Sequence, residues 1–427
     1  MSKSPKIDAV TSYGRLNDSL HTDEKDRARS DTCSPAGGDK VANKAGAELS
    51  RSGMSSPVGD VQFLDLRAVN ARYADALKAA AARVIDSGMY VLGQELQQFE
   101  QKFAAYCGTA YSLGTGNGLD ALSLILKGYR ELGILREGDE VIVPANTFIA
   151  TFLAITHNNL VLVPVEPDPV TFNIDPLAVE KAIGPRTRVI LAVHLYGQLA
   201  DMAALQRLAR CYGLLLIEDA AQAHGASSNG VRAGAFGDAA AFSFFPSKNL
   251  GALGDGGAIT TSDAALAERL RALRNYGSQL KYQHLYQGVN SRLDELQAAM
   301  LLVKLEHLDE EIDCRRKVAK RYLDGIDHPL ITLPTAMSEV QHVWHLFVIR
   351  SPFRDALQAH LAAHGIQTLI HYPVPPHQQP AYAMLAATCL PTSESLHREV
   401  LSLPMGPTLE DEAIERVIAA CQAFVAP

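Results

Sequence analysis

The sequence predicts an α/β fold with a mainly parallel sheet, and two features of the chain indicate it. Short runs of Val, Ile and Leu recur without polar alternation, which is typical of strands covered on both faces. Segments with helical spacing of apolar residues lie between these runs, for example at residues 201–213. Parallel strands need such crossovers, so the alternation favours a sheet with helices on both sides.

The apolar runs give the expected strands in chain order, at residues 141–145, 160–165, 188–197, 213–220 and 239–245. The pattern then changes, because apolar residues after position 290 follow the spacing of one long helix, namely Leu301, Leu305, Leu308 and Ile312. Beyond this helix, an apolar segment at 343–350 and an amphipathic one at 354–366 predict a small α/β domain.

Three parts of the chain are therefore expected. Residues 1–60 carry many charges and few large apolar side chains, so they cannot offset their ordering entropy and are predicted to be disordered. This segment also lacks the apolar core of a signal peptide. Residues 61–305 are expected to form a large domain and residues 306–427 a small C-terminal domain.

Composition limits the classes of partner. The chain has 427 residues, of which 47% are hydrophobic, and no apolar stretch approaches the roughly 20 residues that span a bilayer. We therefore expect a soluble, cytoplasmic protein. The net charge of -8 argues against nucleic acid or an anionic membrane as the main partner.

The cysteines predict free thiols. They form no Cys-x-x-Cys pair, and no histidine cluster has metal-ligand spacing, so we expect reduced cysteines, mostly in the core, and no metal site. There are six: Cys33, Cys107, Cys211, Cys314, Cys389 and Cys421.

Lys248 and Asp219 are the residues that indicate chemistry. Asp219 ends the apolar run Leu-Leu-Leu-Ile-Glu-Asp, and Lys248 follows Ser-Phe-Phe-Pro-Ser just before a glycine-rich stretch. A carboxylate in such a strand needs a cation, and nearby glycines let the backbone approach a ligand closely. Pyridoxal phosphate makes both demands, with an aldehyde for the amine and a pyridine nitrogen for the acid. Glu218 would point to the opposite face of its strand and remains the alternative acid.

Two further segments fit the same cofactor. Gly-Thr-Gly-Asn-Gly at 114–118 precedes an amphipathic helix, so free amides and the helix dipole would face a phosphate. Ser243, near Lys248, offers a hydroxyl. Phe148 follows a predicted strand and could stack on the cofactor ring, although a core position would explain it equally well.

These four segments together, at 111–126, 144–151, 214–226 and 242–257, resemble the sugar-nucleotide aminotransferases of the DegT/DnrJ/EryC1/StrS family. The resemblance covers residues 61–427 and implies a fold-type I, aspartate aminotransferase-like transferase whose large domain binds pyridoxal phosphate. It implies a role for each matching position. Lys248 would form the Schiff base, Asp219 would hold the pyridine nitrogen, and Gln222 would lie beside the ring near its phenolic oxygen.

The remaining cofactor contacts also follow from the resemblance. Phe148 would stack on the ring, Gly118 and Leu119 would give backbone amides to the phosphate, and Ser243 would add its hydroxyl. Many relatives have Thr at the position of Leu119, so only its amide is expected here. Asn290 matches an asparagine that reaches the phosphate of the partner subunit, which implies a homodimer with a shared active site.

Segments at 86–109, 116–122, 275–299 and 368–382 resemble the subgroup that aminates carbon 3 of dTDP-linked 3-oxo-6-deoxyhexoses. The implied reaction takes the amino group of L-glutamate and gives 2-oxoglutarate and a dTDP-3-amino-3,6-dideoxyhexose, a precursor of surface polysaccharides or glycosylated natural products. Met89 departs from the Trp expected in this subgroup. Candidate contacts for the nucleotide sugar are Lys281, Tyr282, Tyr286, His371, Tyr372 and His377, whereas His194 and His224 are expected to be core histidines.

Other functions remain open from sequence. A 4-aminotransferase acting on a UDP- or dTDP-4-keto sugar is the alternative within the family, and a non-catalytic regulatory protein with the same fold is the alternative from another class. A sugar 3-dehydratase is disfavoured, because that branch has His in place of the lysine at position 248.

Overall fold

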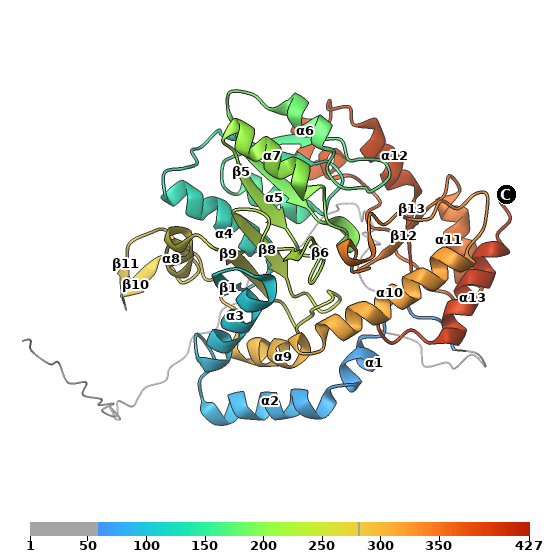
Figure 1. The fold of residues 1–427 in the computed structure, drawn as a ribbon, viewed down its shortest axis with the longest axis horizontal. Helices are drawn as coiled ribbons and strands as arrows, with labels where there is room; N and C mark the ends of the chain where they lie inside the picture. The colour runs from blue at the N-terminus through green and yellow to red at the C-terminus, as the bar shows by residue number, and fades with distance from the viewer. Residues whose placement is uncertain (1–58, 281) are drawn as a thin grey trace, which may run out of the picture. The chain divides into compact units, whose positions relative to one another are not determined.

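A seven-stranded sheet forms the centre of the computed structural model, which describes residues 59–280 and 282–427 (Figure 1). The strand order is β1-β9-β8-β5-β4-β2-β3. Strand β9 pairs antiparallel with β1 and β8, and all other pairs are parallel. The predicted mainly parallel sheet is confirmed. Its strands are β1 (Tyr111–Thr115), β2 (Glu140–Pro144), β3 (Val161–Val165), β4 (Thr187–Val193), β5 (Leu215–Asp219), β8 (Ala239–Ser243) and β9 (Gly257–Thr261).

Four of the five predicted strands begin within one residue of the expected start, whereas β5 begins two residues later, and β4 ends four residues earlier than expected. The sequence analysis missed β1 and β9. Both strands are buried, but glycines and hydroxyl residues interrupt their apolar runs, as at Gly114 and Thr260. The buried Thr260 side chain of β9 has a hydrogen-bond partner, because its hydroxyl donates to the Gly234 carbonyl oxygen.

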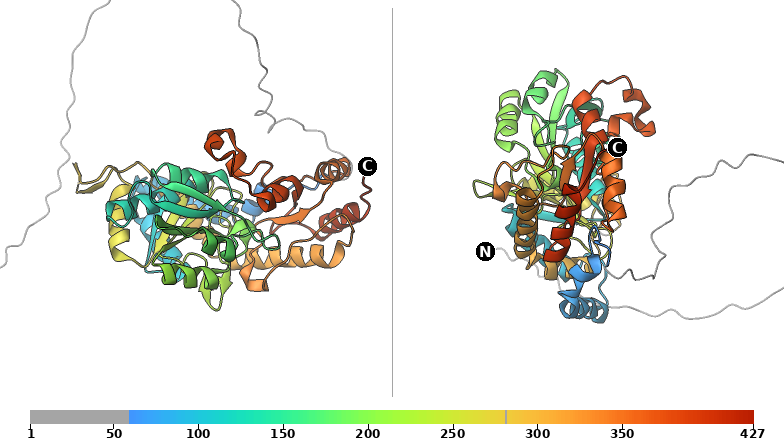
Figure 2. Two further views of the ribbon diagram at one scale, coloured as in Figure 1. Left: turned by 90° about the horizontal axis from the view of Figure 1, so that it is seen from above. Right: turned by 90° about the vertical axis from the view of Figure 1, so that its right-hand side faces the viewer.

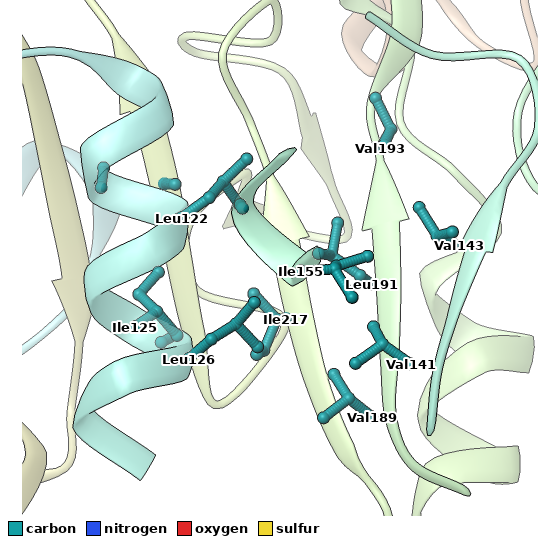
Figure 3. Packing of buried hydrophobic residues seen from close by; sticks show 14 of the residues in the cluster. Leu122, Ile125, Leu126, Val141, Val143, Ile155, Val189, Leu191, Val193 and Ile217 are labelled. Atoms are coloured by element: carbon teal, nitrogen blue, oxygen red, sulfur yellow. The ribbon is translucent and has the colours of Figure 1, made fainter. Parts of the chain in front are cut away.

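Helices cover both faces of the sheet. One face packs against α4 (Gly118–Glu131), α5 (Ile149–Thr156) and α8 (Ala264–Leu273). Figure 3 shows this contact, in which Leu122, Ile125 and Leu126 of α4 approach the strand side chains. The other face packs against α3 (Gln94–Cys107), α6 (Pro176–Ala182), α7 (Met202–Tyr212) and α9 (Glu295–Leu305). Outside these layers, α1 (Leu66–Ala71) precedes α2 (Ala74–Ser87), which packs along α9.

The single long helix predicted after residue 290 is wrong, because two helices occupy this region. Helix α9 ends at Leu305, and α10 (Leu308–Gly325) begins after His307, whose backbone lies outside the helical region at φ -110° and ψ 0°. The His307 ring stacks on Tyr73, with ring centres 4.5 Å apart. All four apolar residues of the predicted stripe are nevertheless buried, on both sides of the break.

The C-terminal part of the chain, called the C-terminal domain below, has its own hydrophobic core beside the sheet (Figure 2). Strands β12 (Phe347–Arg350) and β13 (Val400–Leu403) pair antiparallel and pack with α10, α11 (Arg354–Ala363) and α13 (Asp411–Gln422). Val61 joins this core and pairs with Ile366, so the first described residues pack with the C-terminal domain. The boundary expected between the large domain (residues 61–305) and the small domain (residues 306–427) stays a prediction. Helix α12 (Pro391–Glu399) precedes β13.

Short elements complete the structure. Two hairpins consist of β6 (Ser227–Ser228) with β7 (Val231–Arg232), and β10 (Ser278–Leu280) with β11 (Gln283–His284). The 3-10 turns are η1 (Leu195–Gly197), η2 (Glu339–Gln341), η3 (Pro376–Gln378) and η4 (Pro380–Leu385). No helix among the described residues is both long and apolar enough to cross a membrane.

Two further expectations concern the thiols and the N-terminal segment. The five described cysteines are free, but only Cys107 and Cys421 are buried, so the expectation of mostly core thiols is wrong. Cys211 lies on the exposed side of amphipathic α7, and Cys389 precedes α12. The predicted disorder of residues 1–60 concerns a segment that lies outside the described residues, apart from Gly59 and Asp60.

Candidate active site

A cavity of about 380 Å³ lies where several strands of the sheet end. Strands β2, β4, β5 and β8 run parallel, and β1 runs in their direction because both β1 and β8 are antiparallel to β9. The residues that follow the carboxyl ends of these strands line the cavity, as do residues of the C-terminal domain. Ligands commonly bind at this edge of an open α/β sheet.

Lys248 reaches the cavity from a tight turn after β8. The Lys248 amide donates to the Phe245 carbonyl oxygen at 2.8 Å, and the Asn249 side chain donates to the Val343 carbonyl oxygen at 3.1 Å. Gly251 makes this turn possible, because a Cβ there would lie 2.3 Å from the Pro246 carbonyl oxygen. Burial lowers the pKa of Lys248 to about 8, although the nearby Asp219 carboxylate opposes the change.

Asp219 is the last residue of β5 and faces Lys248 across the cavity. Its carboxylate accepts hydrogen bonds from the Thr151 hydroxyl at 3.0 Å and from the Ala221 amide at 3.2 Å. Burial raises the pKa of Asp219, and these two bonds and the charge of Lys248 only partly offset the rise. A buried carboxylate of this kind favours a ligand that brings a cationic group against it.

Glu218, the alternative acid, lies on the other face of β5 and has no place in the cavity lining. It accepts hydrogen bonds from the amides of Gly234, Phe236 and Gly237. The His194 ring bonds Glu218 through Nε2 at 2.9 Å, while Nδ1 accepts from the Ala200 amide. Because Nδ1 accepts, His194 is the tautomer with its proton on Nε2. This network fixes the end of β5, and therefore the position of Asp219.

The start of α4 forms a cradle for an anion. Asn117 caps the helix by accepting a hydrogen bond from the Asp120 amide, whereas the Gly118 and Leu119 amides lie in the first turn, where no carbonyl oxygen of the helix can accept from them, and both residues line the cavity. Gly118 approaches β8 so closely that a Cβ would lie 2.7 Å from the Ser243 Cβ. Ser243 also lines the cavity.

Phe148 and Gln222 complete the part of the site that the sequence analysis singled out. Phe148 follows β2, is 51% exposed and lies 5.3 Å from the Tyr372 ring, so the alternative of a core phenylalanine does not hold. Gln222 is buried, accepts a hydrogen bond from the Tyr196 amide at 2.6 Å and donates one to the Tyr372 hydroxyl at 3.1 Å.

The candidate contacts for a nucleotide sugar separate into two groups. His371 and Tyr372 line the cavity, and burial lowers the pKa of His371 to about 4, so its ring is neutral. Three others are not brought to it: His377 is fully buried and bonds Glu394, Tyr286 packs under Arg269, and Tyr282 lies 84% exposed beside the β10–β11 hairpin. Lys281 lies outside the described residues.

Asn290 is likewise absent from the cavity lining; it is exposed and pairs with Asn275. Of the two expected core histidines, His194 is bonded as described above, and His224 packs near the rings of Phe242 and Phe244. The sequence analysis missed Thr151, Ser247 and His345. His345 comes from the C-terminal domain, is 6% exposed and lines the cavity.

Comparison with known proteins agrees with this geometry. Residues 72–422 match the family model described as the DegT/DnrJ/EryC1/StrS aminotransferase family. The chain belongs to this family. Its members depend on pyridoxal phosphate, so this chain is an aminotransferase that uses the same cofactor.

Two curated relatives are similar over most of this aminotransferase. The dTDP-3-amino-3,6-dideoxy-alpha-D-galactopyranose transaminase of Aneurinibacillus thermoaerophilus is 55% identical, covering 85% of this chain and 99% of the relative. The dTDP-3-amino-3,4,6-trideoxy-alpha-D-glucose transaminase of Streptomyces venezuelae is 54% identical, covering 85% and 96%. The solved structure of S. venezuelae DesV in complex with a ketimine intermediate superposes with a TM-score of 0.83 at 52% identity, covering 86% of this chain and 100% of DesV.

The cavity fits pyridoxal phosphate. An amine of lowered pKa and a desolvated carboxylate line one space, and the start of α4 supplies an anion cradle, where a Cβ at Gly118 would lie 2.7 Å from the Ser243 Cβ. These groups match the aldehyde, the ring nitrogen and the phosphate of the cofactor. No group of three or more possible metal ligands is gathered anywhere within residues 59–280 and 282–427.

Proposed function

We propose that this aminotransferase transfers the amino group of L-glutamate to carbon 3 of a dTDP-3-oxo-6-deoxyhexose. The products are 2-oxoglutarate and a dTDP-3-amino-3,6-dideoxyhexose. The observation that carries the proposal is the 55% identity, over 85% of the chain, to a transaminase named for a dTDP-3-amino-3,6-dideoxy sugar. The cavity supports it, because Lys248, Asp219 and Gln222 surround one space beside an anion cradle.

Bound pyridoxal phosphate supplies an aldehyde that exchanges amino groups and a ring that accepts electrons. In the proposed site Lys248 would hold the aldehyde in the resting enzyme. Once freed by the amino substrate, its amine would take the proton from the glutamate α-carbon and later give a proton to carbon 3 of the sugar. A pKa of about 8 suits a group that must gain and lose a proton near neutral pH.

The other residues hold the cofactor. Asp219 would keep its ionised carboxylate against the ring nitrogen, with Thr151 and the Ala221 amide fixing the two oxygens. Gln222 would lie beside the ring and Phe148 against its face. The amides of Gly118 and Leu119 and the hydroxyl of Ser243 would bind the phosphate. His371 and Tyr372 line the same cavity and are the candidate contacts for the nucleotide sugar.

We further propose that the enzyme is a homodimer whose sites are shared. Asn290 is exposed and absent from the cavity lining of its own subunit, so it can reach a phosphate only in a second copy. Large apolar side chains are exposed nearby in sequence, at Leu280, Leu285 and Val289, and again at 89–92, where a partner would cover them. Tyr282 precedes Asn290 in the sequence and would meet the sugar nucleotide of the partner.

The experiment that tests the proposed reaction offers the enzyme both carbon-4 epimers of a dTDP-3-oxo-6-deoxyhexose with L-glutamate. NMR of the purified product identifies the carbon that carries nitrogen. We expect amination at carbon 3, with no product from Lys248→Ala. A dTDP-4-keto sugar is the control substrate.

Amination of the 4-keto sugar alone would mean a 4-aminotransferase. A regulatory protein would bind the cofactor, but glutamate would not bleach its visible absorbance. Either result would overturn the proposed reaction.

A further inference from the structure

Tyr196 occupies an unusual place between the two walls of the cavity. Tyr196 is the middle residue of the turn η1, which follows His194 at the end of β4. The residue is 3% exposed. Its backbone has φ 60° and ψ 5°, a left-handed conformation that costs a non-glycine residue about 1 kcal/mol or more. Such strain persists only where the surroundings hold it in place, so the contacts of Tyr196 are informative.

The backbone of Tyr196 contacts the cofactor side of the cavity. Its amide donates to Oε1 of Gln222 at 2.6 Å, and Nε2 of Gln222 donates to the Tyr372 hydroxyl at 3.1 Å. Because the Gln222 oxygen must accept from an amide, the orientation of its side chain is fixed, with the nitrogen toward Tyr372. The Tyr372 oxygen accepts this bond, so its own proton is free to point at a ligand.

The side chain of Tyr196 contacts the opposite wall. Its hydroxyl donates a short hydrogen bond to the carbonyl oxygen of His371, the residue before Tyr372. Its carbonyl oxygen accepts from the Leu346 amide at 3.2 Å, next to His345. One residue of the sheet domain therefore bonds both segments through which the C-terminal domain lines the cavity.

We propose that Tyr196 is a positioning residue that sets the His371–Tyr372 wall against the cofactor side of the site. Its hydroxyl holds the wall through His371, whereas its amide orients Gln222. The two effects are separable, because one uses the side chain and the other the backbone. The proposal rests on the proposed function only in taking the ligand of that wall to be the sugar nucleotide.

Tyr196→Phe tests the inference, because it removes only the hydroxyl and keeps the amide and the ring contact with Phe172. Tyr322→Phe is the matched control. The Tyr322 hydroxyl is also buried and donates to a carbonyl oxygen, that of Pro404 at 3.0 Å, within the core of the C-terminal domain. Both variants thus lose a bond from a buried hydroxyl to a carbonyl oxygen, but only Tyr196→Phe loses it at the cavity.

In Tyr196→Phe we expect the KM for the sugar nucleotide to rise roughly five- to tenfold, the factor that corresponds to one lost hydrogen bond. The kcat should stay within about twofold, as expected for lost positioning of a bound substrate. Hydrogen exchange of the amides within 370–374, where only Pro373 has no amide proton, should become faster. Cofactor affinity and the visible absorbance of the holoenzyme should be unchanged, and Tyr322→Phe should change none of these quantities.

Unchanged exchange at 370–374 in Tyr196→Phe would overturn the inference, as would a loss of cofactor affinity that matches the rise in KM. The exchange and cofactor measurements do not depend on which sugar is aminated. If the wild-type enzyme fails to aminate the 3-oxo sugars, the proposed function fails, while these two measurements still decide the role of Tyr196.

Discussion

At Lys248, burial opposes the charged amine while the Asp219 carboxylate favours it, and burial prevails, so the pKa falls from 10.5 to about 8. Only the neutral amine can attack an aldehyde. In the cofactor-free protein, the rate of pyridoxal phosphate recombination should therefore rise about tenfold per pH unit up to pH 8 and level off above it. Stopped-flow absorbance at a series of pH values measures this profile.

Asp219→Asn provides the control for that profile. Because the Asp219 charge raises the pKa of Lys248, its removal should move the midpoint to lower pH. A midpoint near the ordinary lysine value of 10.5 in the wild-type protein would contradict the assigned environment.

Some residues of the site could be predicted from sequence because a local pattern marks them. Asp219 ends an apolar run, and Lys248 precedes glycines. Thr151 has no such mark: its bond to Asp219 joins positions 68 residues apart, and only the folded sheet brings them together. His345 is a similar case, since a lone histidine in an apolar segment usually belongs to a core.

At the level of elements, prediction succeeded where the apolar pattern was continuous. Strands β4 and β5 are such cases, because helices cover both of their faces. The prediction of elements failed where tertiary contacts decide the structure. Strand β9 is rich in glycine and threonine but is stabilised between β1 and β8, and the break between α9 and α10 follows no glycine or proline.

Helix α4 gives a prediction at this scale. In Gly118→Ala the new Cβ would lie 2.7 Å from the Ser243 Cβ, so the cradle must open. We expect cofactor affinity to fall roughly tenfold or more, while the cofactor-free protein loses about 1 to 3 kcal/mol of stability through overpacking. Equilibrium titration with pyridoxal phosphate measures the affinity, and thermal unfolding measures the stability.

Gly128→Ala is the matched control on the same helix. Its Cβ would meet the Leu266 side chain at 2.8 Å, a similar clash that lies away from the cavity. This variant should lose stability but keep its cofactor affinity. Equal losses of affinity in both variants would show that α4 acts through general stability rather than through the cradle.

At the scale of the whole molecule, the site depends on the packing of two domains. The strand ends of the sheet domain supply Lys248 and Asp219, and the C-terminal domain supplies His345, His371 and Tyr372. The two-domain division stays a prediction, and the sequence alone could not show which of the C-terminal histidines face the cavity. His371 does so and His377 does not, although the two positions are only six apart in the sequence, because His377 is buried against Glu394.

The shared site proposed for the homodimer can be tested by mixing two defective subunits. Lys248→Ala has no amine, and Asn290→Ala should bind the cofactor weakly. If Asn290 serves the partner, a heterodimer of the two variants contains one intact site, formed by Lys248 of one subunit and Asn290 of the other. Differently tagged subunits, co-expressed and purified as heterodimers, should then show about half of the wild-type activity at limiting cofactor. If Asn290 instead serves its own subunit, one site of the heterodimer lacks Lys248 and the other lacks Asn290, and activity should be about half of that of the Asn290→Ala homodimer.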